Sequence, residues 1–294
     1  MHRLVITGAS GQLGRRTAEH ALTLVKPQQL ILVTRRPHLL ADMEARGAQV
    51  RFGDFDDPTS LQQAFAGAQH LLLISAVDLS RRVVQHCTAI AAAVEVGVER
   101  IIYTSMVSPQ APNPAAVAPS HWQTEVELRQ CGIAWTLLRN SLYGDYQMTE
   151  AQQAMSHGRF VHNRGNGRIA YVAREDCAAA AAAVLTSSGH DNQTYEITGP
   201  RSVDAAALAQ LYAVLGGRSV EALATDDATF ITGLLGSNSA DGHARYGAEL
   251  VASFGRAIRE GFLSTCTDTV ARLTGRPAMA LDAVLRQTLN STKA

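Results

Sequence analysis

The amino-acid sequence predicts an α/β fold, in which a doubly wound parallel sheet is followed by a smaller C-terminal α/β lobe. Three observations support this. A short apolar run at residues 3–7 ends in a glycine cluster and passes directly into a helical pattern. Strand-like and helix-like segments then alternate regularly to about residue 140. Beyond that point the alternation breaks down, so we expect one domain over 1–145 and a substrate-binding lobe over 146–294, with some later segments returning to the sheet.

The glycine cluster at residues 8–14, GASGQLG, follows the first expected strand. Gly8 lets the chain turn sharply, Gly11 lets the backbone approach a pyrophosphate, and Gly14 lets the helix pack closely on the sheet. The start of the helix offers free N–H groups to the phosphates. The spacing matches the usual dinucleotide fingerprint only in its second half, and glycine triplets also occur in ordinary turns. We favour a nucleotide site because the cluster lies directly behind a strand.

The other elements of the first half follow in the order that such a sheet requires. Pro58 is typical of the first turn of a helix, and the apolar run at 71–75 suits a strand buried on both faces. The residues at 120–123, SHWQ, indicate a capping box. Further strands are expected at residues 29–34, 48–52, 71–75, 100–105 and 134–138. Helices are expected at residues 11–25, 38–46, 57–66, 80–96 and 120–130.

The second half has a less regular pattern, which we interpret as a lobe that closes over the cofactor and supplies the substrate pocket. The alanine run near residue 180 indicates a closely packed helix face. Loops are expected at residues 158–167, a helix at 175–187, a strand at 194–198, and helices near 204–215, 245–260 and 279–289.

Composition excludes several classes of function. The 26 basic residues balance the 26 acidic ones without a basic run, so nucleic acid is not an expected partner. The longest apolar stretches, 71–77 and 178–185, are too short to span a membrane, and the early first strand leaves no room for a signal peptide. The four cysteines are scattered, with no metal-binding spacing. We therefore expect no metal, no disulfide framework and a cytoplasmic location.

The residues after the second expected strand bear on the choice of cofactor. An acid at this point usually takes the ribose 2′-hydroxyl of NAD. Here Arg35 and Arg36 follow the strand, and no acid lies nearer than Asp42. A guanidinium can pair with a 2′-phosphate, which favours NADP(H); the alternative is that both arginines face water. After the third strand, Asp54 is either an acceptor for the adenine amine or an ordinary turn acid.

The usual catalytic pair of short-chain dehydrogenases, Tyr-x-x-x-Lys, is absent. The chain has two lysines, Lys26 and Lys293, and no tyrosine precedes either at that spacing. Where the pair would lie, the sequence has His121 and Glu125. A histidine near its unperturbed pKa could donate a proton at neutral pH. The alternative is that the two residues form a surface i,i+4 pair.

At these residues the chain resembles the NmrA-like, atypical short-chain dehydrogenases/reductases, and among them bacterial NAD(P)H:quinone oxidoreductases of the type 2 kind and triphenylmethane reductase. The matching stretches lie at residues 5–14, 52–55, 97–105, 135–143 and 189–195. The resemblance implies a Rossmann-type sheet, NADPH in the cleft, and hydride transfer to a quinone or similar flat conjugated or aromatic molecule. The loop at 108–119 and the segment at 224–246 depart from the family's pattern. The identity of the acceptor is therefore the property that can least be inferred from the resemblance.

The resemblance also implies a set of cofactor-binding residues. Those for the pyrophosphate are Gly8, Ser10, Gly11, Gln12, Leu13 and Gly14. Those for the rest of the cofactor are Arg35 at the 2′-phosphate, Asp54 and Phe55 at the adenine, Ile74 and Ser75 at the nicotinamide ribose, and Thr104.

A quinone accepts hydride readily, so it needs positioning more than a strong acid. Asn140 and Tyr143, just past the sixth expected strand, could bind the acceptor's oxygens, and His121 completes the candidate catalytic residues. Met106 and Trp122 could form apolar walls. Each of these could equally serve packing. The expected partner is a small-molecule acceptor, and a homodimer is left open. The alternative function is an NADP(H)-sensing regulatory protein without turnover.

Overall fold

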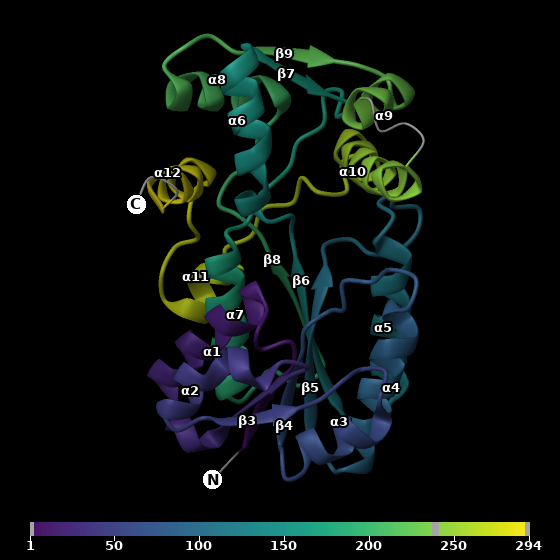
Figure 1. Cartoon of the computed structure of the whole chain (residues 1–294), viewed down its shortest axis with the longest axis vertical. Helices are drawn as coiled ribbons and strands as arrows, with labels where there is room; N and C mark the ends of the chain where they lie inside the picture. The colour runs from purple at the N-terminus through teal and green to yellow at the C-terminus, as the bar shows by residue number, and fades with distance from the viewer. Residues whose placement is uncertain (1–2, 237–240, 292–294) are drawn as a thin grey trace.

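The computed structural model describes residues 3–236 and 241–291 and shows a parallel sheet with a lobe at one end (Figure 1). The seven strands of the main sheet lie in the order β3-β2-β1-β4-β5-β6-β8, and every neighbouring pair is parallel. The strands are β1 (Leu4–Ile6), β2 (Leu30–Thr34), β3 (Gln49–Phe52), β4 (His70–Leu73), β5 (Arg100–Met106), β6 (Ala134–Asn140) and β8 (Gln193–Ile197). The predicted fold class is confirmed.

Helices cover both faces of this sheet, so its central strands are buried on both sides. One face carries α1 (Gln12–Leu24), α2 (Ala41–Ala45), α7 (Arg174–Thr186) and α11 (Thr269–Thr274). The other carries α3 (Pro58–Phe65), α4 (Arg82–Glu95) and α5 (Ala118–Gln130). Because side chains alternate along a strand, Ile102 and Leu138 face α1 and α7, whereas Tyr103 and Leu137 face α3 to α5.

The lobe lies beyond the carboxyl ends of β5 and β6 (Figure 1). Met106, the last residue of β5, belongs to the lobe's apolar cluster, and β6 continues through a short 3-10 turn, η3 (Gly144–Tyr146), into the lobe. Two strands of the lobe, β7 and β9, pair in parallel and form a separate small sheet. The elements are α6 (Gln147–His157), β7 (Arg159–His162), α8 (Ala205–Gly216), β9 (Glu221–Ala224), α9 (Asp227–Leu235), α10 (Gly242–Arg259) and α12 (Leu281–Ser291).

Several expected elements differ from those observed. Residues 158–167, expected as loops, contain the strand β7, and α6, α9, α11 and β9 were not expected. The capping box is wrong: α5 begins after Val117, and the Ser120 hydroxyl donates to the Val117 carbonyl while accepting from Arg82. The helix α7 and the strand β8 return to the main sheet, so the boundary at residue 145 stays a proposal. Lys293 and residues 237–240 of the weakly matching segment lie outside the described residues.

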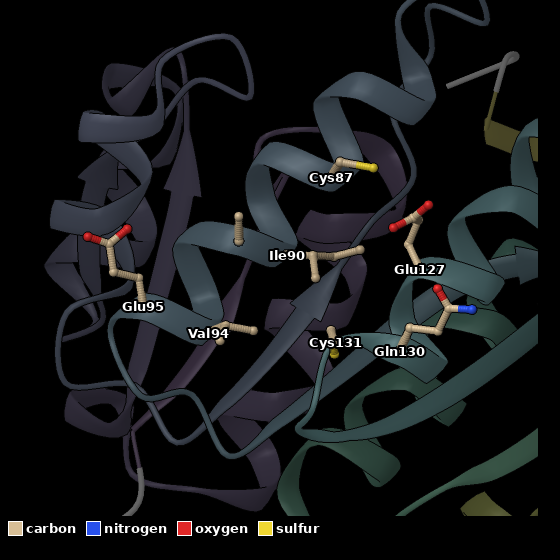
Figure 2. Close-up of a pocket in the computed structure, with 8 residues that line it drawn as sticks. Cys87, Ile90, Val94, Glu95, Glu127, Gln130 and Cys131 are labelled. Atoms are coloured by element: carbon tan, nitrogen blue, oxygen red, sulfur yellow. The ribbon is translucent and has the colours of Figure 1, made fainter.

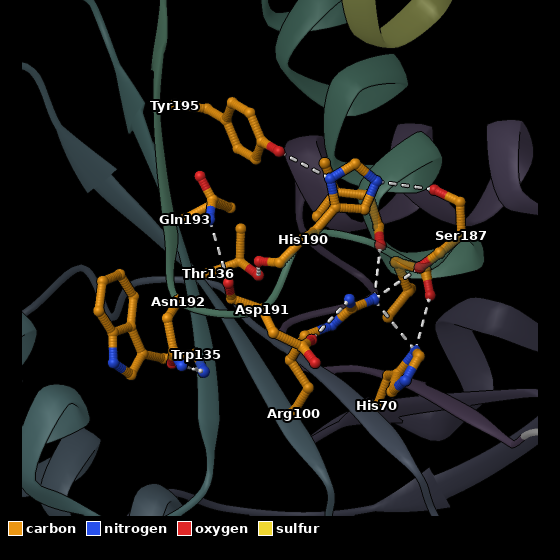
Figure 3. A network of polar contacts seen from close by, with 12 residues as sticks. His70, Arg100, Trp135, Thr136, Ser187, His190, Asp191, Asn192, Gln193 and Tyr195 are labelled. Atoms are coloured by element: carbon orange, nitrogen blue, oxygen red, sulfur yellow. Dashed lines mark hydrogen bonds and ion pairs between the residues drawn. The ribbon is translucent and has the colours of Figure 1, made fainter.

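A polar network at the amino end of the sheet holds the end of α7 there (Figure 3). The guanidinium of Arg100, 2 % exposed, donates to the carbonyls of Val184 and Ser187 at 2.9 and 2.8 Å and to the carboxylate of Asp191 at 3.2 Å. A cation at the carboxyl end of a helix satisfies carbonyls that would otherwise lack partners. Arg100 therefore fixes the last turn of α7 against β5.

The described parts of the chain include no helix that is both long and apolar enough to cross a membrane. They also include no group of three or more His, Cys, Asp or Glu side chains that could hold a metal ion. The four cysteines are free thiols.

Candidate functional site

The glycine turn lies at the carboxyl end of β1, between β2 on one side and β4 on the other. Open α/β sheets bind ligands at such a reversal of strand order. Gly8 has a φ of +60°, and its carbonyl accepts from the Gly11 amide at 2.9 Å. A Cβ on Gly14 would lie 2.4 Å from the same carbonyl, so the helix passes too close for any side chain. The geometry matches the roles that the sequence assigned to Gly8 and Gly14.

The first turn of α1 offers amides to a ligand. Gly11 is the N-cap and provides no side-chain cap. In the described structure the amides of Gln12 and Leu13 donate no hydrogen bond. Such amides and the positive end of the helix dipole suit an anionic group. The Ser10 hydroxyl is held 2.7 Å from that of Thr34, which ties the turn to the end of β2.

Arg35 and Arg36 follow β2 directly, and both are exposed. No ion pair of Arg35 occurs among the described residues. The nearest acid in sequence, Asp42, is engaged by Arg15, whose guanidinium lowers the pKa of that carboxyl. No competing acid therefore follows β2, and Arg35 is available to a phosphate.

Asp54 and Phe55 follow β3 and have local roles. The Asp54 carboxylate accepts from the Asp56 amide at 3.1 Å, and the Asp54 amide donates to the Ser60 hydroxyl at 3.0 Å. These bonds are those of an acid in a turn before a helix. The Phe55 ring packs edge-on to His86, with ring centres 6.3 Å apart. Contact of either residue with adenine stays a prediction.

The segment after β4, which contains Ile74 and Ser75, is held in place through hydrogen bonds of its backbone amides. The amides of Ile74, Ser75 and Ala76 donate to the side chains of Thr7, Thr104 and His86 at 3.0, 2.9 and 2.9 Å. Ile74 also lies beside Gly8, because a Cβ on that glycine would be 3.7 Å from the Ile74 Cβ. Three consecutive amides anchored in this way fix the backbone next to the glycine turn. Thr104 thus holds the Ser75 amide, and contact of Ile74, Ser75 or Thr104 with the cofactor stays a prediction.

His86 was missed in the sequence, although a buried histidine in a helix could have drawn attention. Its Nε2 accepts from the Ala76 amide, so the ring must be neutral with its proton on Nδ1, which lies 2.9 Å from the Thr124 hydroxyl. Burial and the nearby Arg82 lower its pKa to about 3. Arg82 donates to the Ala76 carbonyl at 2.7 Å, so α4 holds both polar groups of this residue.

The alternative interpretation, in which His121 and Glu125 form a surface pair, is wrong, because both are buried. His121 lies in the face of the sheet that α5 covers, with Nδ1 2.7 Å from the Tyr103 hydroxyl. Burial lowers the pKa of His121 well below its ordinary value, so His121 is neutral at pH 7 and the expectation of a pKa near the unperturbed value is wrong. A catalytic role of His121 stays a prediction. The Glu125 carboxylate accepts from Ser105 at 2.6 Å and from Arg139 at 2.7 and 2.9 Å.

Asn140 and Tyr143 are brought together at the carboxyl end of β6. The Asn140 Nδ2 donates to the Tyr143 hydroxyl at 3.3 Å, and Met106 lies opposite Asn140 in the register of β5 and β6. Asn140 lies two residues after Leu138 in β6, so the two side chains share a face of the sheet. This is the face that α1 covers, across the sheet from His121. The Asn140 Oδ1 and the Ser141 hydroxyl are buried without a protein partner. Burial raises the pKa of the Tyr143 phenol, so it stays protonated.

Trp122 does not join these residues. Its ring lies 5.6 Å from the guanidinium carbon of Arg129, which in turn lies 5.0 Å from the Trp135 ring. A groove of about 520 Å³ between α4 and α5 is lined by Cys87, Ile90, Ala91, Val94, Glu95, Glu127, Gln130 and Cys131 (Figure 2). None of the candidate site residues lines this groove.

Known proteins resemble this chain over most of its length. The model of the family described as NAD(P)H-binding matches residues 8–188. The chain is 34% identical to quinone oxidoreductase 2 of Escherichia coli (strain K12), over 95% of this chain and 96% of that protein. The structure of an NADPH-dependent quinone oxidoreductase from Escherichia coli, complexed with NADPH, superposes with a TM-score of 0.92 at 32% identity, over 97% of this chain and 99% of that one. Citrobacter sp. triphenylmethane reductase, complexed with NADP(H), superposes with a TM-score of 0.88 at 31% identity, over 97% and 99%.

Proposed function

The chain belongs to the NAD(P)H-binding family, and on that premise we propose that it is an NADPH-dependent reductase that transfers hydride to a quinone or a similar flat conjugated molecule. The observation that carries the proposal is the position of the Asn140–Tyr143 pair. It lies on the same edge and the same face of the sheet as the glycine turn, with a buried oxygen that has no partner. Relatives that are named for quinone and triphenylmethane reduction support it.

The residues around the glycine turn fit NADPH. The amides of Gln12 and Leu13 would bind the pyrophosphate, where the absence of a side chain on Gly11 leaves the backbone accessible. Arg35 would pair with the 2′-phosphate. The anchored segment of Ile74 and Ser75 would lie against the nicotinamide ribose. When bound, the cofactor supplies a hydride.

The acceptor would be positioned mainly by hydrogen bonds and apolar contact. The Tyr143 hydroxyl accepts a hydrogen bond from Asn140 and keeps its own proton, with which it would donate a hydrogen bond to an acceptor oxygen. Reduction of a quinone to a hydroquinone takes one hydride and one proton. Because His121 is neutral and lies on the other face of the sheet, we assign that proton to water. The site therefore acts chiefly through proximity and orientation.

An acceptor panel tests this proposal. NADPH oxidation is followed with benzoquinone, naphthoquinone, a triarylmethane dye and an aryl ketone, with a blank without acceptor. We expect turnover with quinones and faster turnover with NADPH than with NADH. Tight NADP(H) binding without turnover on the whole panel, together with recovery of a stable protein partner, would instead support a regulatory protein.

The cytoplasmic location stays a prediction, and the oligomeric state stays open. The free cysteines fit the reducing cytoplasm that the sequence predicts. A homodimer can be checked by sedimentation of the purified protein.

A further inference from the structure

Arg174, the first residue of α7, lies between the two halves of the candidate site. Its side chain is 7% exposed, and its Nη1 donates to the Gln12 side-chain oxygen at 2.7 Å and to the Asp145 carboxylate at 3.3 Å. Its amide donates to the other Asp145 oxygen at 2.9 Å. One residue thus contacts both the glycine turn and the segment that follows β6.

The same guanidinium also contacts the aromatic rings of that segment. Its central carbon lies 5.1 Å from the Tyr143 ring centre and 4.9 Å from that of Tyr146. Cation–π contacts of a poorly solvated guanidinium are stronger than those at exposed sites. The Tyr143 ring, whose hydroxyl accepts from Asn140, is therefore held in part by Arg174.

The backbone brings these groups together. The Gly144 amide donates to the Val172 carbonyl at 2.8 Å, and the Val172 amide donates to the Leu142 carbonyl at 3.0 Å. The segment after β6 is thereby attached to the residues that lead into α7. That helix lies beside α1, which begins at Gln12 (Figure 1).

The junction between the two segments borders a cavity. The cavity has a volume of about 340 Å³, and its lining includes Gln12, Asp145, Tyr146 and Arg174. Side chains that border a cavity have fewer close contacts on that side. The planar guanidinium, with several donors and two aromatic contacts, can hold both segments at once, whereas a lysine ammonium cannot reproduce this geometry.

We propose that Arg174 is a positioning residue that couples the cofactor turn to the acceptor segment. It fixes the Gln12 side chain on one side and the ring of Tyr143 on the other. Ordering of the turn by the cofactor is therefore transmitted to the acceptor segment before the acceptor binds. The proposal rests on the proposed function for the identity of the two sites.

Hydrogen exchange tests the coupling without any turnover. In the wild-type protein, saturating NADP⁺ slows amide exchange in residues 141–147, by about tenfold for a coupling of ordinary strength. In Arg174→Gln, NADP⁺ still binds but this slowing is lost. Arg174→Lys loses most of it, because the charge alone does not span the two segments. The matched control is Arg168→Gln, which removes an arginine from an exposed ion pair with Asp204 and should keep the full effect.

Gln12→Ala provides the same test from the exposed end of the contact, and so serves even if Arg174→Gln fails to fold. It keeps the backbone amide and removes the side-chain carboxamide whose oxygen accepts from Arg174. Full slowing in Gln12→Ala, or in a folded Arg174→Gln, would overturn the proposal, as would the absence of slowing in the wild type. Failure of the wild type to reduce any quinone would refute the proposed function but leave the exchange result intact.

Discussion

The Asn140 side chain donates to the Tyr143 hydroxyl over 3.3 Å while its own oxygen stays buried without a partner. A buried polar group without a partner is costly. The pair therefore presents one acceptor oxygen without a protein partner and one phenol proton. We expect these groups to recognise polar atoms of the bound cofactor and acceptor.

Tyr143→Phe is expected to raise KM for the quinone by about 2- to 13-fold, which corresponds to one neutral hydrogen bond of 0.5–1.5 kcal/mol. The maximal rate should fall less than tenfold, because the phenol positions the acceptor and does not titrate near neutral pH. Steady-state kinetics check this. Tyr195→Phe is the control, since its hydroxyl contacts His190 in the network at the amino end of the sheet. A loss of activity beyond about 10⁴-fold would instead indicate an obligatory proton donor.

Arg35→Ala is expected to weaken NADPH binding by about 10- to 150-fold, on the order of 1.5–3 kcal/mol for a hydrogen bond to a charged group. NADH binding should hardly change, since NADH lacks the 2′-phosphate. Fluorescence titration of both cofactors measures the ratio. Arg46→Ala removes another exposed arginine beyond α2 and should leave it unchanged. An unaltered ratio in Arg35→Ala would show that Arg35 does not recognise the phosphate.

Gly14→Ala is expected to destabilise the protein and abolish NADPH binding, because its Cβ would lie 2.4 Å from the Gly8 carbonyl oxygen and 2.8 Å from the Ala9 Cα. Neither backbone group can move without displacing the turn. Gly247→Ala, inside α10 with open space at the Cβ position, should instead stabilise by about 0.5–1 kcal/mol. Thermal unfolding and cofactor titration distinguish the two variants. Normal binding by Gly14→Ala would contradict the close approach of α1 to the turn.

The stability of the protein should depend on pH through His86. Its pKa falls from 6.5 to about 3 in the folded state, so the unfolded chain binds more protons between these values. The unfolding free energy is therefore not reduced by His86 above pH 6.5. It falls as the pH drops from 6.5 toward 3, by up to about 1.4 kcal/mol per pH unit. In His86→Gln, the side-chain oxygen can still accept from the Ala76 amide, and no titration remains. Its unfolding free energy should fall less steeply with decreasing pH than that of the wild type. Equal slopes would contradict a neutral, amide-accepting His86.

The glycine turn was predictable because its determinants are local: Gly8 and Gly14 act within one strand, turn and helix. Asn140 and Tyr143 were predictable from their place after a strand. The burial of His121 and Glu125 was not, because Tyr103 and Arg139 come from neighbouring strands.

The role of Arg174 likewise depends on a long-range contact. It meets Gln12 across 162 residues, because α7 returns to the sheet. The strands β7 and β9 have four residues each, too few for a clear alternation of apolar and polar positions.

The most direct test of the account is a single turnover without oxygen. Stoichiometric protein, NADPH and naphthoquinone are mixed, and the loss of NADPH and the formation of hydroquinone are measured together. We predict one hydroquinone for each NADPH oxidised, at a rate that exceeds the reaction without protein. Bound NADPH that persists in the presence of the quinone, with no hydroquinone formed, would contradict the account.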